Sequence, residues 1–185
     1  PICPTLLALR VAVFIMLMIG IASTDAKYYV IPDGFTIFGL VWVLVTAFAA
    51  VFTGSASAFA TPYDAMMGAL AGAGAIAIAG WLGEAALKRE AMGFGDVTLM
   101  AVVGAALGPQ RALLTIFIGA AIGVVVFVGV VLPVTRFRAH PADADGTDVA
   151  TLPLVPFGVF LAPAAIVSLF YGNALIQWYF THFIG

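Results

Sequence analysis

Residues 5–24 read TLLALRVAVFIMLMIGIAST, a run in which Arg10 is the one charged residue. A helix needs about 20 mainly apolar residues to cross a bilayer. The apolar positions here are continuous rather than alternating, which indicates a helix and not a strand of a membrane barrel. The run therefore predicts a first spanning helix over about Thr5–Thr24.

Further apolar runs follow, and turn-forming residues such as Pro32-Asp33-Gly34 and Gly108-Pro109 separate them. We expect helices over about Phe35–Phe52, Tyr63–Trp81 or as far as Leu87, Val97–Leu107, Ala112–Val131 and Leu154–Phe170. The predicted fold class is all-α, a polytopic transmembrane bundle of about six spanning helices. We expect residues 1–185 to form a single transmembrane domain.

Composition supports this class. Of the 185 residues, 64% are hydrophobic and 9% are charged, whereas a soluble domain carries about 25% charged residues. This excludes a soluble domain and a disordered chain, and the net charge of −2 excludes a nucleic-acid binder built on a basic surface. The one cysteine, Cys3, excludes an internal disulfide framework and a zinc site built from cysteines.

Basic residues are unequally distributed between the two sides of the predicted bundle. One side holds Lys27, Lys88, Arg89, Arg136 and Arg138, and the other holds Arg111 and at most Arg10. An excess of Lys and Arg in short loops marks the cytoplasmic side. We therefore expect a multi-pass protein of the plasma (inner) membrane, surrounded by lipid, with the Lys27 side in the cytoplasm.

Two predicted helices contain glycines spaced four positions apart, Gly68 with Gly72 and Gly119 with Gly123. Small residues at this spacing let helix backbones approach closely. We interpret both pairs as packing sites within the bundle. Dedicated dimerisation is the alternative, and the sequence leaves the oligomeric state open.

Two acidic residues stand apart from the others. Asp64 and most other acids have ordinary positions at solvated helix ends, but Asp25 closes the first predicted helix and Asp96 precedes the fourth in GFGD, residues 93–96. The predicted topology places both on the cytoplasmic side. A carboxylate at that depth needs a partner or a polar cavity, so we expect the two to share one cavity.

Two neighbouring carboxylates cannot both ionise easily, so one keeps a proton and the other is a base. Aspartyl proteolysis requires this arrangement, because the base takes a proton from water while the acid polarises the scissile carbonyl. Glycines around Asp96 would allow close backbone approach and φ angles closed to other residues. Two alternatives stay open: a transporter that uses Asp25 and Asp96 as a proton or cation site, and a structural scaffold in a secretion assembly.

Three segments of the chain resemble one known family. Residues 25–36 read DAKYYVIPDGFT, residues 91–101 read AMGFGDVTLMA and residues 155–162 read VPFGVFLA. They are similar to the D-x6-P-D/N-x-[LFW]-T, MGxGDxxLxA and PFGPFLA segments of the type IV prepilin peptidases, membrane aspartyl proteases of the GxGD class. Val159 stands where the family usually has proline. The segments occur in the family's order and together span most of the chain.

The resemblance implies that Asp25 and Asp96 are the catalytic pair of an endopeptidase with a cytoplasmic-side active site. Residues implied to bind substrate or support the site are Asp33, Gly93, Gly95, Pro156, Phe157 and Gly158. We also expect the Pro156–Gly158 segment to break the last helix near the site. The implied partners are prepilins and pseudopilins, cut between a basic leader and the hydrophobic segment that becomes the pilus-core helix.

The cysteine count departs from many bacterial relatives, which carry two Cys-x-x-Cys pairs in a cytosolic domain linked to N-methylation of the trimmed pilin. This sequence has Cys3 alone and begins with Pro1. We expect a peptidase without methyltransferase activity in this chain, or a domain upstream of Pro1. His140 and His182 have no partners at metal-ligand spacing, so we expect neither a metal site nor a cofactor.

Overall fold

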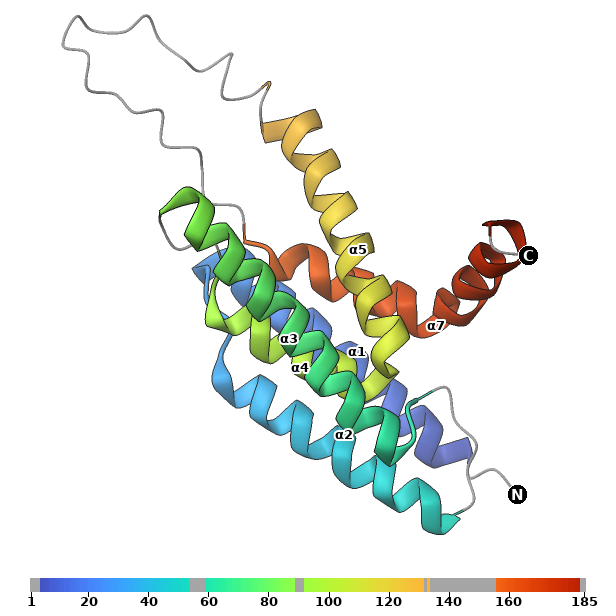
Figure 1. The fold of residues 1–185 in the computed structure, drawn as a ribbon. Coiled ribbons are helices and arrows are strands. Elements are labelled where there is room, and N and C mark those ends of the chain that lie inside the picture. The colour runs from blue at the N-terminus through green and yellow to red at the C-terminus, as the bar shows by residue number, and fades with distance from the viewer. Residues whose placement is uncertain (1–3, 54–58, 89–91, 132, 134–155, 184–185) are drawn as a thin grey trace, which may run out of the picture.

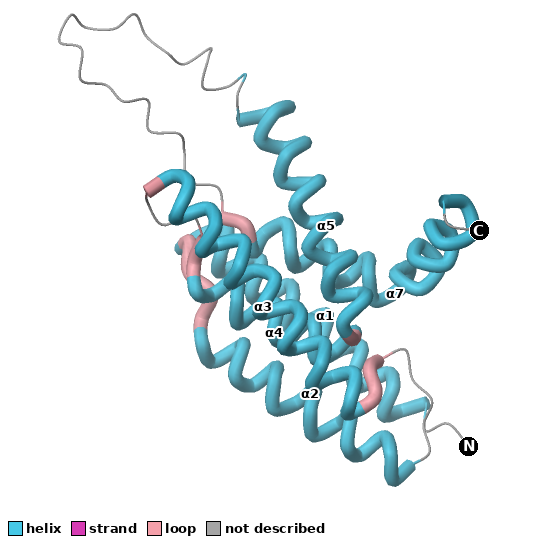
Figure 2. The backbone as a smooth tube through the Cα atoms, viewed as in Figure 1, coloured by secondary structure: helices cyan, strands magenta, loops and turns pink. Residues whose placement is uncertain are grey.

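The computed structural model describes residues 4–53, 59–88, 92–131, 133 and 156–183. Its helices are α1 (Pro4–Tyr28), α2 (Asp33–Thr53), α3 (Pro62–Leu87), α4 (Phe94–Leu107), α5 (Pro109–Val126) and α7 (Gly158–Phe183). A π-helical turn, η1 (Phe127–Val131), continues α5. No strand occurs within these residues, and short loops join α1 to α2 and α4 to α5 (Figure 2). The predicted all-α bundle is confirmed.

Five of the helices, α1, α2, α3, α5 and α7, are long and apolar enough to cross a bilayer. The 14 residues of α4 are apolar but shorter, and at 1.5 Å per residue they rise about 21 Å against a hydrocarbon thickness of about 30 Å. The chain is a multi-pass membrane protein, and α4 is the shortest α-helix among the described residues.

The end of α1 differs from its predicted position. The helix continues to Tyr28 instead of ending at Thr24, so Asp25 lies within its last turn. Tyr29 ends it in the left-handed conformation, with a φ of 56°, and its N–H donates a 2.9 Å hydrogen bond to the carbonyl of Asp25. This conformation is uncommon for a residue with a bulky side chain. The connection to α2 then begins directly beside Asp25.

The start of α7 also differs from its predicted position. The helix begins at Gly158, directly after Pro156 and Phe157, and the predicted start at Leu154 lies outside the described residues. Pro156 and Phe157 are not helical, and because residues 151–155 lie outside the described residues, the expectation that the Pro156–Gly158 segment breaks the last helix stays a prediction. The carbonyl of Phe157 accepts hydrogen bonds from the N–H groups of Phe160 and Leu161, so Phe157 caps the start of α7 and Pro156 lies just before the cap.

At its other end, α7 continues past the predicted end at Phe170 to Phe183. Polar residues such as Gln177 lower the hydropathy of this stretch, but they are exposed and compatible with a helix. This last part of α7 turns away from the bundle and runs across the direction of α3 (Figure 1). It carries the exposed aromatic residues Trp178 and Tyr179, which suit the interface between bilayer and water.

The centre of the bundle is α4, which packs closely against α3. Residues 102–107 of α4 are all buried. A methyl group added at Gly68 would collide with the backbone carbonyl of Gly104, and one added at Gly72 would collide with the carbonyl of Met100. The predicted packing role of Gly68 and Gly72 is confirmed, with α4 of the same chain as the partner.

The second glycine pair serves the contact between α5 and α7. A methyl group at Gly119 would lie 3.0 Å from Cδ2 of Leu161, and one at Gly123 would lie 3.4 Å from the ring of Phe160. Packing within the bundle is confirmed here too. Toward η1, the end of α5 separates from the other helices (Figure 1).

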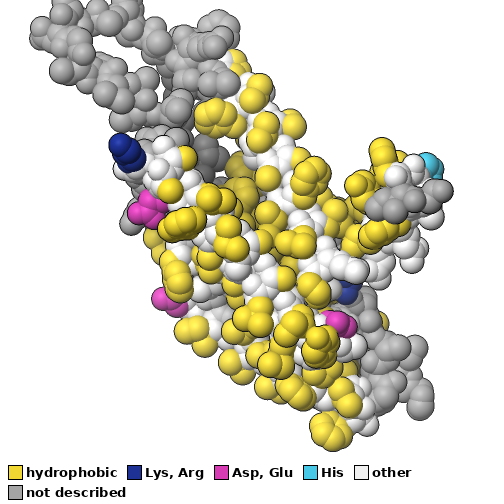
Figure 3. All heavy atoms as spheres, viewed as in Figure 1, with side chains coloured by type: hydrophobic (Ala, Val, Ile, Leu, Met, Phe, Trp, Pro, Cys, Tyr) yellow, Lys and Arg dark blue, Asp and Glu magenta, His cyan; other side chains and the backbone are white. Residues whose placement is uncertain are grey.

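Charged side chains gather near the ends of the bundle. On the face shown in Figure 3, hydrophobic side chains cover the middle of the helices, and charged ones lie near their ends. The end of α1 and the starts of α2, α4 and α7 meet at one end of the bundle (Figure 1). This end carries Asp25, Asp33 and Asp96.

Candidate active site

A cavity of about 520 Å³ lies where α1 ends and α2 and α4 begin. It is lined by Asp25, Tyr29, Val30, Ile31, Asp33, Met92, Gly93, Phe94, Gly95, Asp96, Pro156 and Phe157. Seven of the eight predicted site residues are in this lining, and the eighth, Gly158, contacts Asp25. The fold therefore brings the three sequence segments of the resemblance to one place.

Asp25 reaches the cavity from the last turn of α1, and its side chain is 5% exposed. Its Oδ2 accepts a 3.1 Å hydrogen bond from the backbone N–H of Val159, at the start of α7. The N-terminus of a helix favours a carboxylate, because its first N–H groups lack partners within the helix. The start of α7 therefore orients Asp25.

Gly158 lies directly against the carboxylate of Asp25. A methyl group added at Gly158 would lie 2.7 Å from Oδ2 of Asp25 and 3.1 Å from Cδ1 of Ile31. These distances leave no room for a side chain unless Asp25 moves. Glycine at this position thus permits the approach of α7 on which the Val159 hydrogen bond depends.

Asp96 reaches the same cavity from the first turn of α4 and is 8% exposed. Its backbone N–H donates a 3.1 Å hydrogen bond to the carbonyl of Gly93, the N-cap residue of α4. Its carboxylate is close enough to Asp25 for the two charges to interact. Two buried carboxylates from different helices therefore share one cavity.

The glycines before Asp96 differ in what they contribute. A methyl group at Gly95 would lie 2.9 Å from Cβ of Ile31, so Gly95 lets Ile31 of the same chain pack closely against it. The close approach of a substrate backbone to these glycines stays a prediction. Gly93 has φ −75° and ψ 149°, an extended conformation open to any residue. Among the glycines that the structure describes, a positive φ occurs at Gly108. The expectation of unusual φ angles around Asp96 is wrong, because neither an extended N-cap nor a helical turn needs them.

Asp33 is the exposed first residue of α2 and lines the cavity from there. Its backbone carbonyl accepts a 3.0 Å hydrogen bond from Oγ1 of the buried Thr36. A carboxylate in the first turn of a helix is stabilised by the helix dipole. Asp33 therefore supports the start of α2 and adds a third acidic group to the cavity.

Sequence reasoning missed Ile31, Tyr29 and the N–H of Val159. Ile31 is buried between Gly95 and Gly158, and Tyr29 lines the cavity beside Asp25. Both belong to the six unspecified residues of the D-x6-P pattern. Because this segment is short, its residues cannot lie far from Asp25, and that proximity could have identified them. The contribution of Val159 comes from its backbone and leaves no signature in side-chain patterns.

The cavity suits acid–base chemistry on water. An ionised carboxylate accepts protons and hydrogen bonds, and a protonated one donates. The lining residues that the structure describes include no Ser, Cys, Lys or His that could act as a nucleophile. In the part of the chain that the structure describes, no three His, Cys, Asp or Glu side chains form a group able to hold a metal ion.

The chain is similar to known proteins over a range that includes Asp25 and Asp96. Residues 12–128 match the type IV leader peptidase family. A prepilin leader peptidase/N-methyltransferase of Stutzerimonas stutzeri is 30% identical over 162 residues, 88% of this chain and 49% of the relative. One of Xanthomonas campestris pv. campestris is 30% identical over 173 residues, 93% of this chain and 52% of the relative.

A third relative, the prepilin leader peptidase/N-methyltransferase of Aeromonas hydrophila, is 29% identical over 121 residues, 65% of this chain and 37% of the relative. The chain thus spans 37–52% of the length of these three relatives. No solved structure matches the chain. The family match covers most of the chain, and two of these relatives align with nearly all of it. The chain belongs to the type IV leader peptidase family.

Proposed function

We propose that this chain is an aspartyl endopeptidase that removes the leader peptide of prepilins or prepilin-like proteins, with Asp25 and Asp96 as its catalytic pair. The observation that carries the proposal is the meeting of these two buried carboxylates at one cavity. Family membership supports the substrate class. Residues 1–185 act together as one transmembrane peptidase domain.

The two carboxyl groups hydrolyse the peptide bond with a water molecule held between them. The ionised group takes a proton from water as the water oxygen attacks the carbonyl carbon, and the protonated group gives its proton to the carbonyl oxygen. The gem-diol then collapses and the C–N bond breaks. The leaving nitrogen takes the proton from the first carboxyl, and the second regains one from a diol hydroxyl. Both groups return to their starting protonation states.

The cavity lies on the cytoplasmic side of the inner membrane in this proposal. The exposed Lys27 and Lys88 belong to the helix ends at the cavity end of the bundle. Arg10 and Arg111, at the starts of α1 and α5, are buried. Short loops with exposed basic residues favour the cytoplasm. Arg89, Arg136 and Arg138, the other residues of this argument, lie outside the described ranges.

The charge of the cavity suits the leader of such a substrate. Among the residues that the structure describes, its lining contains Asp25, Asp33 and Asp96 and no basic residue. Complementary charge guides association and fixes the orientation of a bound segment. A basic leader therefore fits the cavity better than an acidic or purely apolar one.

Asp25→Asn and Asp96→Asn test the proposal directly. Each variant, purified and incubated with a co-encoded prepilin, should cleave about 100- to 10,000-fold more slowly, the range expected when a general acid or base is lost. Asp64→Asn, at the start of α3 and outside the cavity, is the control and should cleave at the wild-type rate. Leader release at the normal rate by either test variant would overturn the assignment.

The same preparation separates this proposal from the transporter interpretation. A transporter that uses Asp25 and Asp96 as its ion site would show flux that depends on a proton gradient in liposomes, and it would leave prepilin intact. Mass spectrometry of the product reports cleavage and N-methylation together. We expect a trimmed, unmethylated N-terminus from these 185 residues, because they contain one cysteine.

A further inference from the structure

A second cavity, of about 320 Å³, lies between α5 and the start of α7. It is lined by Ala120, Gly123, Val124, Phe127, Phe157 and Phe160. We call this surface the α5–α7 groove. All six residues are apolar or glycine, so the described part of the groove offers neither a charge nor a polar side chain to a ligand.

The groove exists because α5 and α7 pack closely at one level and separate at the next. Contact is tight at Gly119, where a methyl group would lie 3.0 Å from Leu161. Toward the candidate active site, α5 passes into η1, and Phe127 at the start of η1 lines the groove. Such π-helical turns are frequent at functional sites. Here the turn coincides with the separation of α5 from the bundle (Figure 1).

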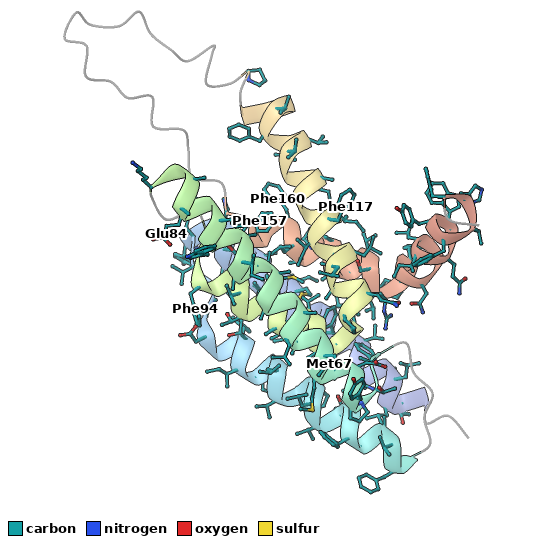
Figure 4. All side chains as sticks on the ribbon, viewed as in Figure 1. Met67, Glu84, Phe94, Phe117, Phe157 and Phe160 are labelled. Carbon is teal, nitrogen blue, oxygen red and sulfur yellow. The ribbon has the colours of Figure 1, made fainter. Side chains whose placement is uncertain are left out.

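The groove adjoins the candidate active site. Phe157 lines both the groove and the cavity that contains Asp25 and Asp96. Figure 4 shows Phe157 and Phe160 between α3 and α5, where the surface in Figure 3 is hollowed. Phe157 is therefore the residue that the groove shares with the cavity of the two carboxylates.

The two cavities differ in chemistry, and together they select a ligand with two parts. The cavity with Asp25, Asp33 and Asp96 is acidic, whereas the α5–α7 groove is apolar. A continuous ligand would place a basic segment in the first and a hydrophobic helix in the second. Lipid tails are as apolar as this groove, so shape rather than hydrophobicity favours a helix there: Ala120 and Gly123 are small residues of the kind that let another helix approach closely within a membrane.

We propose that the α5–α7 groove binds the hydrophobic helix of the prepilin, so that the peptide bond preceding that helix reaches Asp25 and Asp96 past Phe157. This inference rests on the proposed function and adds a recognition surface to it. Val124 contributes to the groove, and its neighbour Val125 is similarly exposed but lies outside it, at 62% and 70% exposed respectively. Val124 and Val125 therefore allow the same substitution to be compared inside and outside the groove.

The first experiment uses photo-crosslinking in the Asp96→Asn background, with a co-encoded prepilin in liposomes. A photoreactive phenylalanine analogue replaces Val124 or Phe160 in the groove, and Val125 or Phe117 as controls. Phe117 is 74% exposed on α5 and lies outside the groove. We expect crosslinks from the two groove positions to the hydrophobic segment of the prepilin, at least fivefold above the controls. Equal labelling at all four positions, or crosslinks to lipid or to a second copy of this chain alone, would overturn the proposal.

The second experiment uses kinetics in the otherwise unchanged chain. Val124→Trp should fill part of the groove and raise KM for the prepilin about tenfold while kcat changes less than twofold. Val125→Trp should leave both values unchanged. Equal KM values for the two variants would refute the groove as a docking site. Wild-type cleavage is measured in parallel: if the wild type leaves the leader attached, the proposed function itself fails, whereas normal cleavage with no difference between Val124 and Val125 removes the groove alone.

Discussion

The backbone N–H of Val159 donates a 3.1 Å hydrogen bond to Oδ2 of Asp25, a residue 134 positions earlier in the chain. This bond joins the first and last helices of the bundle at one carboxylate. It means that α7, which carries neither aspartate, helps to determine where one of them points. Variants at the start of α7 should therefore affect the chemistry of the site more than the stability of the fold.

Replacement of Val159 by proline removes this hydrogen bond. Proline has no N–H but is tolerated in the first turn of a helix, and the family pattern usually has proline here. A typical hydrogen bond contributes a net 0.5–1.5 kcal/mol, so we expect kcat for prepilin cleavage to fall about three- to tenfold. Val159→Ala keeps the N–H and should cleave like wild type. Equal kcat values for the Pro and Ala variants would show that the bond does not matter for the reaction.

A side chain at position 158 should displace Asp25 directly. In Gly158→Ala the new methyl carbon would lie 2.7 Å from Oδ2 of Asp25, so the carboxylate must move. We expect cleavage to fall about 100-fold, since small misplacements of catalytic groups are costly. Gly34→Ala, in the first turn of α2 with no atom within 4 Å of the added carbon, is the control. Cleavage at the control rate by Gly158→Ala would contradict the observed packing.

The two glycines before Asp96 should respond differently to the same substitution. Gly95→Ala would bring a methyl group 2.9 Å from Cβ of Ile31, whereas the nearest atom to one at Gly93 is 4.0 Å away. We therefore expect Gly95→Ala to lower kcat/KM at least tenfold more than Gly93→Ala does. Steady-state cleavage of prepilin measures both, and the reverse order would show that packing against Ile31 is not what requires Gly95.

We expect the thermal stability of the fold to depend on the close contact between α3 and α4. A methyl group at Gly68 collides with the backbone of Gly104, while one at Gly74, on the same helix, meets nothing within 4 Å. Overpacking costs about 1–3 kcal/mol, and Tm shifts about 2–4 °C per kcal/mol in a chain of this size. Gly68→Ala should thus lower Tm in detergent by roughly 2–12 °C. Gly74→Ala should leave it unchanged or slightly higher, because alanine favours a helix over glycine.

The apolar runs predict most of the fold, because a bilayer requires long stretches without charge and internal hydrogen bonding of the backbone. Helix ends follow these runs less well. α1 continues through Asp25 to Tyr28, and α7 continues through Gln177 to Phe183. Both extensions contain polar residues near an end of a long helix, where hydropathy no longer distinguishes helix from loop.

The sequence by itself determined the membrane class and singled out Asp25 and Asp96, because charge is so scarce in this chain that a carboxylate at a helix end stands out. Tertiary structure alone decided that Val159 holds Asp25, that Ile31 lies between Gly95 and Gly158, and that an apolar groove adjoins the acidic cavity. The physical reason is that these properties act over different distances along the chain. Hydropathy and charge act on neighbouring residues along the chain, whereas a hydrogen bond across 134 positions depends on how the helices pack.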